Sequence, residues 1–294
     1  MKLINYIHDG EAKLGIREAK GVLDVAKAAA SLGASVPATI TAAIEGGTEG
    51  REALSALVRR ASGLEDCWLE EDTLTLGPSV THPSKIICVG LNYRKHAEET
   101  NAAIPQYPIL FNKFNNTLAA HGEDIPLPRV TDKVDYEAEL VIVIGRQAKY
   151  VGREEALDYV FGYTCVNDLS ARDLQMRTAQ WLLGKSLDKF SPLGPYLVTA
   201  DEIPDPNNLA ISCTVNGEVR QRSNTSDMIF RCDEIVSYIS QHMTLLPGDI
   251  ILTGTPEGVV LGYPEERQVY LRPGDHVTID IESIGSLSNR MAAE

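Results

Sequence analysis

From residue 85 onward, the chain is a series of short apolar runs separated by turns rich in Gly, Pro and Asn. Runs of this kind, bounded by turn residues, predict β-strands. We expect strands at residues 85–90, 108–114, 134–145, 159–167, 195–198, 209–215, 218–222, 249–253 and 276–282, and helices at 153–157, 170–178 and 232–242. Because strands outnumber helices and do not alternate with them regularly, the pattern argues against a doubly wound sheet or a barrel of βα units. It predicts a β-rich α+β fold.

The first part of the chain is richer in Ala and Gly than the rest. Residues 2–18 predict a hairpin that turns at Asp9-Gly10, and residues 22–32 and 51–61 are amphipathic. The change of texture around Pro78 and Pro83 places a boundary between residues 72 and 83. We therefore expect a small N-terminal domain at 1–75, with a supporting role, and a larger catalytic domain at 80–294.

The chain has a formal net charge of −14, and no stretch concentrates Lys and Arg. This charge disfavours nucleic acid as a partner. An acidic surface also repels an anionic ligand at long range, so a carboxylate substrate would need local cations, either a metal ion or buried Lys and Arg.

The five cysteines are widely spaced and form no CxxC pair, which favours a reduced, cytoplasmic setting. The N-terminus lacks the apolar core of a signal peptide, and no run is long enough to cross a bilayer. We therefore expect no membrane partner.

Two acids, Glu137 and Glu139, open the strand at 134–145, which then becomes wholly apolar. Positions i and i+2 of a strand share one face about 6.5 Å apart, close enough for both side chains to reach one ion. Taken alone, the pair is more typical of an exposed strand start, where both acids face solvent. Asp168 stands at the end of another predicted strand and at the start of a helix, where it would also serve as a cap. Three carboxylates without a nearby His or Cys are the ligands that Mg²⁺ or Mn²⁺ prefers, and they leave positions open for a 2-oxo acid.

Several stretches together resemble the fumarylacetoacetate hydrolase superfamily, in the branch of acylpyruvases and 2-hydroxyhepta-2,4-diene-1,7-dioate isomerases. They are Val89-Gly-Leu-Asn-Tyr-Arg-Lys-His-Ala-Glu-Glu99, Asp135-Tyr-Glu-Ala-Glu139, Asn167-Asp-Leu-Ser-Ala-Arg-Asp-Leu-Gln175, Gly184-Lys-Ser186 and Gly248-Asp-Ile-Ile-Leu-Thr-Gly-Thr-Pro256. The resemblance covers residues 80–284. It implies a mixed β-sandwich roll with a smaller N-terminal domain, a homodimer, and Mg²⁺ or Mn²⁺ as the metal, with Ca²⁺ as an alternative.

By this resemblance, the metal ligands are Glu137, Glu139 and Asp168. It also assigns a water-activating pair to His96 and Glu99, whose i, i+3 spacing makes them neighbours on a short helix; the spacing alone is typical of a solvated helix face. Expected substrate contacts are Arg172, Gln175, Lys185 and Thr255, with Lys185 also catalytic; Lys113 and Tyr93 are weaker candidates.

These residues favour hydrolysis of a carbon-carbon bond in a small 2,4-dioxo acid such as an acylpyruvate. We expect such an enzyme to act in catabolism. The alternatives are decarboxylation of an oxaloacetate-like acid and isomerisation or hydration of a hydroxymuconate-type acid on the same metal site, because one fold supports several reactions. A binding module would not need His96 and Glu99, and a scaffold would not need three converging carboxylates. In the segment 97–107, which covers the site by the same resemblance, Ile104 and Tyr107 suggest an apolar acyl group.

Overall fold

The computed structural model describes residues 1–294, and its largest element is a 12-stranded mixed sheet. Its main path runs β4-β3-β2-β1-β14-β12-β11-β17-β6-β7, with β5 beside β1 and β8 beside β14. The strands are β1 (Lys2–His8), β2 (Glu11–Glu18), β3 (Gly21–Asp24), β4 (Trp68–Leu69), β5 (Thr75–Leu76), β6 (Ile86–Gly90), β7 (Ile109–Lys113), β8 (Leu118–Ala119), β11 (Ala138–Ile144), β12 (Val160–Asn167), β14 (Ser191–Thr199) and β17 (Ile250–Leu252).

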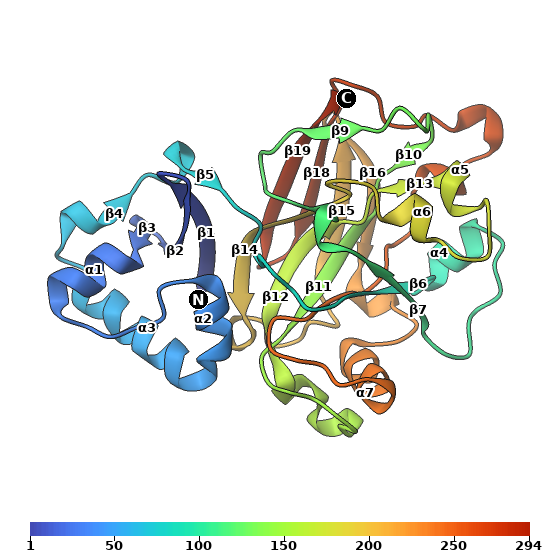
Figure 1. The fold of residues 1–294 in the computed structure, drawn as a ribbon. Helices are drawn as coiled ribbons and strands as arrows, with labels where there is room; N and C mark the ends of the chain where they lie inside the picture. Colours follow the sequence, from blue (N-terminus) through green and yellow to red (C-terminus); the bar gives the residue numbers. More distant parts are fainter.

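A second, five-stranded sheet has the order β16-β15-β18-β19-β9 and packs on β11, β12 and β14 (Figure 1). Its strands are β9 (Ile125–Leu127), β15 (Ala210–Val215), β16 (Glu218–Asn224), β18 (His276–Ile281) and β19 (Gly285–Ala293). A turn at Asn216-Gly217 joins β15 to β16, and both of its residues have positive φ. Both sheets are open, and the β-rich α+β prediction is confirmed.

The predicted N-terminal hairpin is present as β1 and β2, which turn at Asp9-Gly10. Three helices cover these strands on one side: α1 (Val25–Leu32), α2 (Ile40–Glu45) and α3 (Gly47–Ala61) (Figure 1). The amphipathic segment predicted at 22–32 is strand β3 at its start and helix α1 after Asp24, whose side chain caps the helix. Strand β1 also pairs with β14, with Lys2 opposite Val198.

Strands β11 and β12 explain the long apolar runs in the second part of the chain. Every residue of both strands is buried. Strand β11 lies between β12 and β17, and side chains from its two faces enter different apolar clusters: Leu140 and Ile142 belong to one, and Val141 and Val143 to the other. A strand covered on both faces favours apolar residues along most of its length, and Glu139 is the only charged residue of β11.

The helices near the acidic residues are short: α4 (Arg94–Glu99), α5 (Arg172–Gln175) and α6 (Leu182–Lys185). One predicted helix has the wrong extent. The helix expected at 170–178 is reduced to α5, because Ser170–Ala171 form strand β13 and pair with β10 (Val134–Asp135). The segment 153–157 is a 3-10 helix, Arg153–Tyr159, and α7 (Cys232–His242) matches its prediction.

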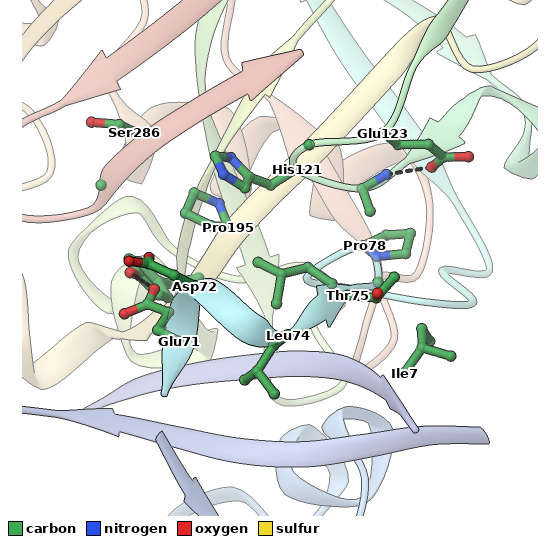
Figure 2. A pocket seen from close by; sticks show the side chains of 16 residues that line it. Ile7, Glu71, Asp72, Leu74, Thr75, Pro78, His121, Glu123, Pro195 and Ser286 are labelled. Carbon is green, nitrogen blue, oxygen red and sulfur yellow. Dashed lines mark hydrogen bonds between the residues drawn. The ribbon is translucent and has the colours of Figure 1, made fainter. Parts of the chain in front are cut away.

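A cavity of about 1000 Å³ lies between the N-terminal strands and the second sheet. Figure 2 shows Ile7, Leu74 and Thr75 on one side of it and His121 and Pro195 on the other. None of the predicted site residues lines it. No helix is both long enough and apolar enough to span a membrane.

Candidate active site

The three predicted metal ligands meet where β11 begins and β12 ends. Glu137 precedes β11, Glu139 is its second residue, and Asp168 follows β12. Antiparallel pairing places Glu139 opposite Val166, and the Asp168 N–H donates to the Glu137 carbonyl (2.9 Å). All three side chains are buried, and one carboxylate oxygen from each lies within 4.8 Å of the others. The pairing of β11 with β12 therefore brings Asp168 to Glu137 and Glu139, which stand 31 and 29 positions before it in the sequence.

Two lysines hold Asp168 from opposite sides. Lys185 Nζ donates to Asp168 Oδ2 (2.8 Å) and to Glu137 Oε2 (2.7 Å). Lys113 Nζ donates to Asp168 Oδ1 and to the Phe190 carbonyl (2.6 Å). Both ammonium groups are buried, so each is stabilised by the carboxylates it contacts.

Arg172, on α5, is buried between acids. Its Nε donates to Asp135 Oδ2 (2.8 Å) and its Nη1 to Gln175 Oε1 (2.9 Å). Its Nη2 lies 2.7 Å from Glu137 Oε1 but has no hydrogen bond of good geometry. Nη2 is thus held by the charge of Glu137, and Arg172 joins Asp135 to the acidic group.

The acids differ in their electrostatic surroundings. Burial opposes ionisation of Glu137, but Lys185 and Arg172 outweigh it and lower the pKa of this carboxyl to about 2. Burial, with the charges of Asp168 and Glu137, raises the pKa of Glu139 well above its usual value. The Glu139 carboxylate accepts a hydrogen bond from the Gly254 N–H (2.7 Å) and contacts no cationic side chain. Glu139 is the acid that gains most from a bound cation.

This donor set fits a hard divalent ion, because it offers carboxylate oxygens alone. In the buried cluster, four carboxylates (Asp135, Glu137, Glu139 and Asp168) face three cations (Lys113, Arg172 and Lys185). With all groups ionised, one negative charge remains, and a divalent ion would turn it into one positive charge. The site then attracts an anionic substrate despite the acidic surface.

His96 and Glu99 form the expected pair on α4. His96 Nδ1 lies 2.7 Å from Glu99 Oε1, and the other oxygen, Oε2, accepts a hydrogen bond from the Gly258 N–H (2.9 Å). His96 is 7% exposed. With Nδ1 assigned as the donor to Glu99, Nε2 is the free ring nitrogen that can accept a proton.

A cavity of about 650 Å³ joins these groups. Apart from Asp168 and the weaker candidates Lys113 and Tyr93, all the predicted site residues line it: His96, Glu99, Glu137, Glu139, Arg172, Gln175, Lys185 and Thr255. The remaining wall is largely apolar and includes Phe111, Met176, Trp181, Leu261 and Tyr263. Figure 1 shows α4, α5 and α6 grouped around this end of the molecule.

Some predicted residues do not line this cavity. Lys113 contacts the cluster only through Asp168, and Tyr93 is fully buried before α4. Tyr107 stacks on Tyr238 with ring centroids 6.5 Å apart, and Ile104 is half exposed. The suggestion that Ile104 and Tyr107 shape the acyl pocket therefore has no support in the structure. Of the segment 97–107, the residues that line the cavity are Glu99, Thr100, Asn101 and Ala102.

The structure adds two polar residues that the sequence interpretation left without a role. Gln221, on β16, accepts the Ala138 N–H (2.9 Å) and donates to Thr255 Oγ1 (2.9 Å), so it orients Thr255. Asp135 contacts Arg172 and the loop after Thr255. Asp135 stands two positions before Glu137, so the period of a strand could have drawn attention to it; nothing in the sequence around Gln221 does so.

Residues 85–292 match the family described as Fumarylacetoacetate (FAA) hydrolase C-terminal. The match covers most of the chain, and it agrees with the fold and with the position of the acidic group. The chain therefore belongs to the fumarylacetoacetate hydrolase family, and it is an enzyme of that superfamily.

Three similar proteins of the superfamily have names that describe different reactions. The Bos taurus protein named oxaloacetate tautomerase FAHD2A, mitochondrial, is 44% identical over 259 residues, which are 87% of this chain and 81% of the relative. The fumarylacetoacetate hydrolase of psychrophilic Exiguobacterium antarcticum has a TM-score of 0.84 at 35% identity and 100% coverage of both chains. Maleylpyruvate hydrolase from Sphingobium sp. SYK-6, solved with manganese(II) and pyruvate, has a TM-score of 0.80 at 30% identity, with coverage of 100% and 99%. Similar proteins thus include a tautomerase and hydrolases.

Proposed function

We propose that this enzyme transfers a proton at the carbon next to the keto group of a small 2-oxo acid, and that its reaction is the keto-enol tautomerisation of oxaloacetate. The observation that carries the proposal is that His96, backed by Glu99, lines the same cavity as Glu137, Glu139, Arg172 and Lys185. The name of the Bos taurus relative supports the choice of oxaloacetate.

Substrate binding falls to the polar groups of the cavity. We assign one substrate carboxylate to the Arg172 guanidinium, which lines the cavity, and to the amide of Gln175 beside it. Thr255, oriented by Gln221, supplies a hydroxyl to the same end of the ligand. Lys185 carries a positive charge at the keto oxygen, because Asp168 and Glu137 outweigh the effect of burial and raise the pKa of its ammonium group.

Glu137, Glu139 and Asp168 would hold Mg²⁺ or Mn²⁺, with Ca²⁺ as the alternative. The bound ion would supply Lewis-acid polarisation of the 2-oxo acid. The manganese in the maleylpyruvate hydrolase structure supports the choice of a divalent ion.

His96 performs the proton transfer. Its Nε2 takes a proton from C3 of the substrate, the C3–H electron pair forms the C2–C3 double bond, and the C2=O π pair moves to the keto oxygen. The His96 imidazolium then returns the proton to that oxygen, which gives the enol and restores the neutral imidazole. Glu99 accepts the Nδ1–H and stabilises the imidazolium that forms in between. The reverse sequence returns the keto form, so no water is consumed.

A second candidate is hydrolysis of a carbon-carbon bond in a 2,4-dioxo acid, since the His96-Glu99 pair could equally deprotonate water. The hydrolases among the similar structures favour it. Decarboxylation of oxaloacetate is the third reaction open to the same residues.

A substrate panel with product analysis tests these reactions. The wild-type enzyme, with Mg²⁺ or Mn²⁺ and then with EDTA, is given enol oxaloacetate, an acylpyruvate and keto oxaloacetate, while enol absorbance, carboxylic acid products and CO₂ are followed. We expect metal-dependent loss of the enol signal without CO₂, abolished in His96→Ala and in Glu137→Gln. Enol decay at the uncatalysed rate with rapid acylpyruvate cleavage would replace tautomerisation by hydrolysis, and undiminished turnover in Glu137→Gln would refute the metal site.

The setting and assembly of the enzyme are further proposals. All five cysteines are buried free thiols, which supports a reducing compartment. We propose a cytoplasmic enzyme, although the Bos taurus relative is named mitochondrial, and a homodimer. Cell fractionation and analytical ultracentrifugation test the two proposals.

A further inference from the structure

Asp135 is a fully buried acid on strand β10 that reaches two different parts of the site. Its Oδ2 accepts a hydrogen bond from Arg172 Nε (2.8 Å) and another from the Leu261 N–H (3.1 Å). Its Oδ1 accepts the Val260 N–H (2.9 Å). One carboxylate thus receives three donors, one from the cationic side chain and two from a loop 125 and 126 positions away.

Asp135 binds the loop at residues 254–262. This loop also contacts Glu99 of the catalytic pair. The Gly258 N–H donates to Glu99 Oε2 (2.9 Å), on the side of Glu99 away from His96. Gly262 packs so closely on Glu99 that a Cβ there would lie 2.5 Å from Cδ. Tyr136 OH donates to the Gly258 carbonyl (3.0 Å). Asp135 and Tyr136, adjacent in sequence, therefore hold both the end of this loop and its middle.

Only a carboxylate satisfies all three donors at position 135. An amide has one acceptor oxygen, and its NH₂ group would face either Arg172 Nε–H or a backbone N–H. Such a contact leaves a buried donor unsatisfied, which is more costly than losing one exposed hydrogen bond. The contacts made by Asp135 are consequently sensitive to the smallest change of side chain.

We propose that Asp135 is a positioning residue that fixes the catalytic pair and the substrate-binding Arg172 relative to each other. It acts on Glu99 through Val260, Leu261 and the Gly258 N–H, and on the substrate carboxylate through the orientation of Arg172. The inference rests on the roles proposed for His96, Glu99 and Arg172. It predicts two separable effects, on kcat through Glu99 and on KM through Arg172.

The test compares Asp135→Asn with a matched control, Asp249→Asn. Asp249 is likewise fully buried and contacts one cationic side chain, accepting from the Lys85 ammonium (2.6 Å). It also accepts from the Lys85 N–H (2.9 Å), the Leu246 N–H (2.7 Å) and the Ser84 hydroxyl (2.5 Å), but it does not line the cavity. We expect Asp135→Asn to lower kcat roughly 10-fold or more and to raise KM. Asp249→Asn should leave both constants within about 2-fold of the wild type while lowering stability comparably. Equal losses of kcat in the two variants would overturn the proposal.

A double-mutant cycle with Glu99→Gln separates positioning from general disruption. When Glu99 no longer serves His96, Asp135→Asn should change kcat by less than about 2-fold, whereas its effect on KM persists because Arg172 is still disturbed. An unchanged kcat effect in the Glu99→Gln background would overturn the proposal.

Tyr136→Phe provides the same test if Asp135→Asn does not fold. It removes one hydrogen bond to the Gly258 carbonyl and leaves Asp135 intact. We expect kcat to fall roughly 2- to 10-fold, with no further effect in Glu99→Gln. A folded Tyr136→Phe protein with wild-type kcat would contradict the proposal that this loop positions Glu99.

Failure of the proposed reaction is recognised separately. It appears in the wild-type enzyme alone, as no turnover of enol oxaloacetate, and the variants are then compared on whichever 2-oxo acid is turned over. Oxalate binding with Mg²⁺ is measured alongside by calorimetry, because it needs no turnover. Asp135→Asn should weaken oxalate binding through Arg172 and Asp249→Asn should not; equal affinities in the two variants would overturn the Arg172 part of the inference.

Discussion

Replacing Gly262 with Ala places one methyl group against the carboxylate of Glu99. The added carbon would lie 2.5 Å from Cδ, 2.6 Å from Oε2 and 2.9 Å from Oε1. Ordinary contact begins at 3.4 Å, so the carboxylate must retreat by about 0.9 Å. The backbone at Gly262 does not have positive φ, so Ala introduces no strain of its own. Because the end of a Glu side chain moves easily, the protein should fold while Glu99 is displaced.

The displacement should cost the enzyme its oriented imidazole. A shift of this size stretches the 2.7 Å contact between His96 Nδ1 and Glu99 Oε1 beyond hydrogen-bond range if it is directed away from the ring. A hydrogen bond to a charged group contributes about 1.5 to 3 kcal/mol. If that contribution is made in the transition state, kcat falls roughly 10- to 150-fold.

Initial rates on enol oxaloacetate with saturating Mg²⁺ measure the effect. Gly152→Ala is the control, because a Cβ at that position would have no atom within 4 Å. In a Glu99→Ala background the methyl group has room, and Gly262→Ala should then change kcat by less than about 2-fold. Wild-type kcat in the single variant, or an equal loss in the Glu99→Ala background, would refute displacement of Glu99 as the cause.

Three further predictions address the proposed metal ligands, the cavity wall and the half-buried His121. Mg²⁺ at about 100 times its Kd should raise the free energy of unfolding by about 2.7 kcal/mol, and Glu139→Gln should abolish this gain without destabilising the metal-free protein; calorimetric melting with and without Mg²⁺ checks both. Gly90→Ala puts a Cβ 2.5 Å from Trp181 Cζ3, so we expect overpacking to cost about 1 to 3 kcal/mol of stability and KM to rise, as urea unfolding and steady-state kinetics would show. Burial lowers the pKa of His121, so the unfolded chain binds this proton first as pH falls; the stability linked to His121 is present above its unfolded pKa of about 6.5 and is lost below it. Urea unfolding at pH 7.5 and 5.5 should therefore show a smaller loss for His121→Asn than for the wild type, and an equal loss would contradict the assignment.

The acidic site was predictable because it depends on local patterns. The alternation at Glu137 and Glu139 fixes a shared face, and the apolar residues that follow fix the strand on which they stand. Asp168 was predictable as a strand-end acid, and its approach to Glu137 follows from the pairing of β11 with β12. The convergence of the three acids depends on no distant contact beyond that one pairing, whereas their assignment as metal ligands came from the family resemblance.

Other parts of the structure depend on contacts that the sequence does not display. Strand β19 was missed because polar residues interrupt its apolar positions, and its partner β18 determines its conformation. Ser170–Ala171 were expected to be helical, but pairing with β10 overrides the local preference. The role of Asp135 depends on a loop 125 positions away. Such long-range hydrogen bonds leave no periodic pattern in the sequence.

The pairing of β1 with β14 limits how the chain can be shortened for study. Thr199 N–H donates to the carbonyl of Met1 (3.0 Å), and Leu197 and Val198 of β14 are fully buried. A truncated chain that starts near residue 80 would turn β14 into an open edge strand with unpaired backbone groups, a common cause of aggregation. Shortened versions of this enzyme made for crystallisation or display should therefore retain the first strand, or carry a charged residue on the exposed edge of β14.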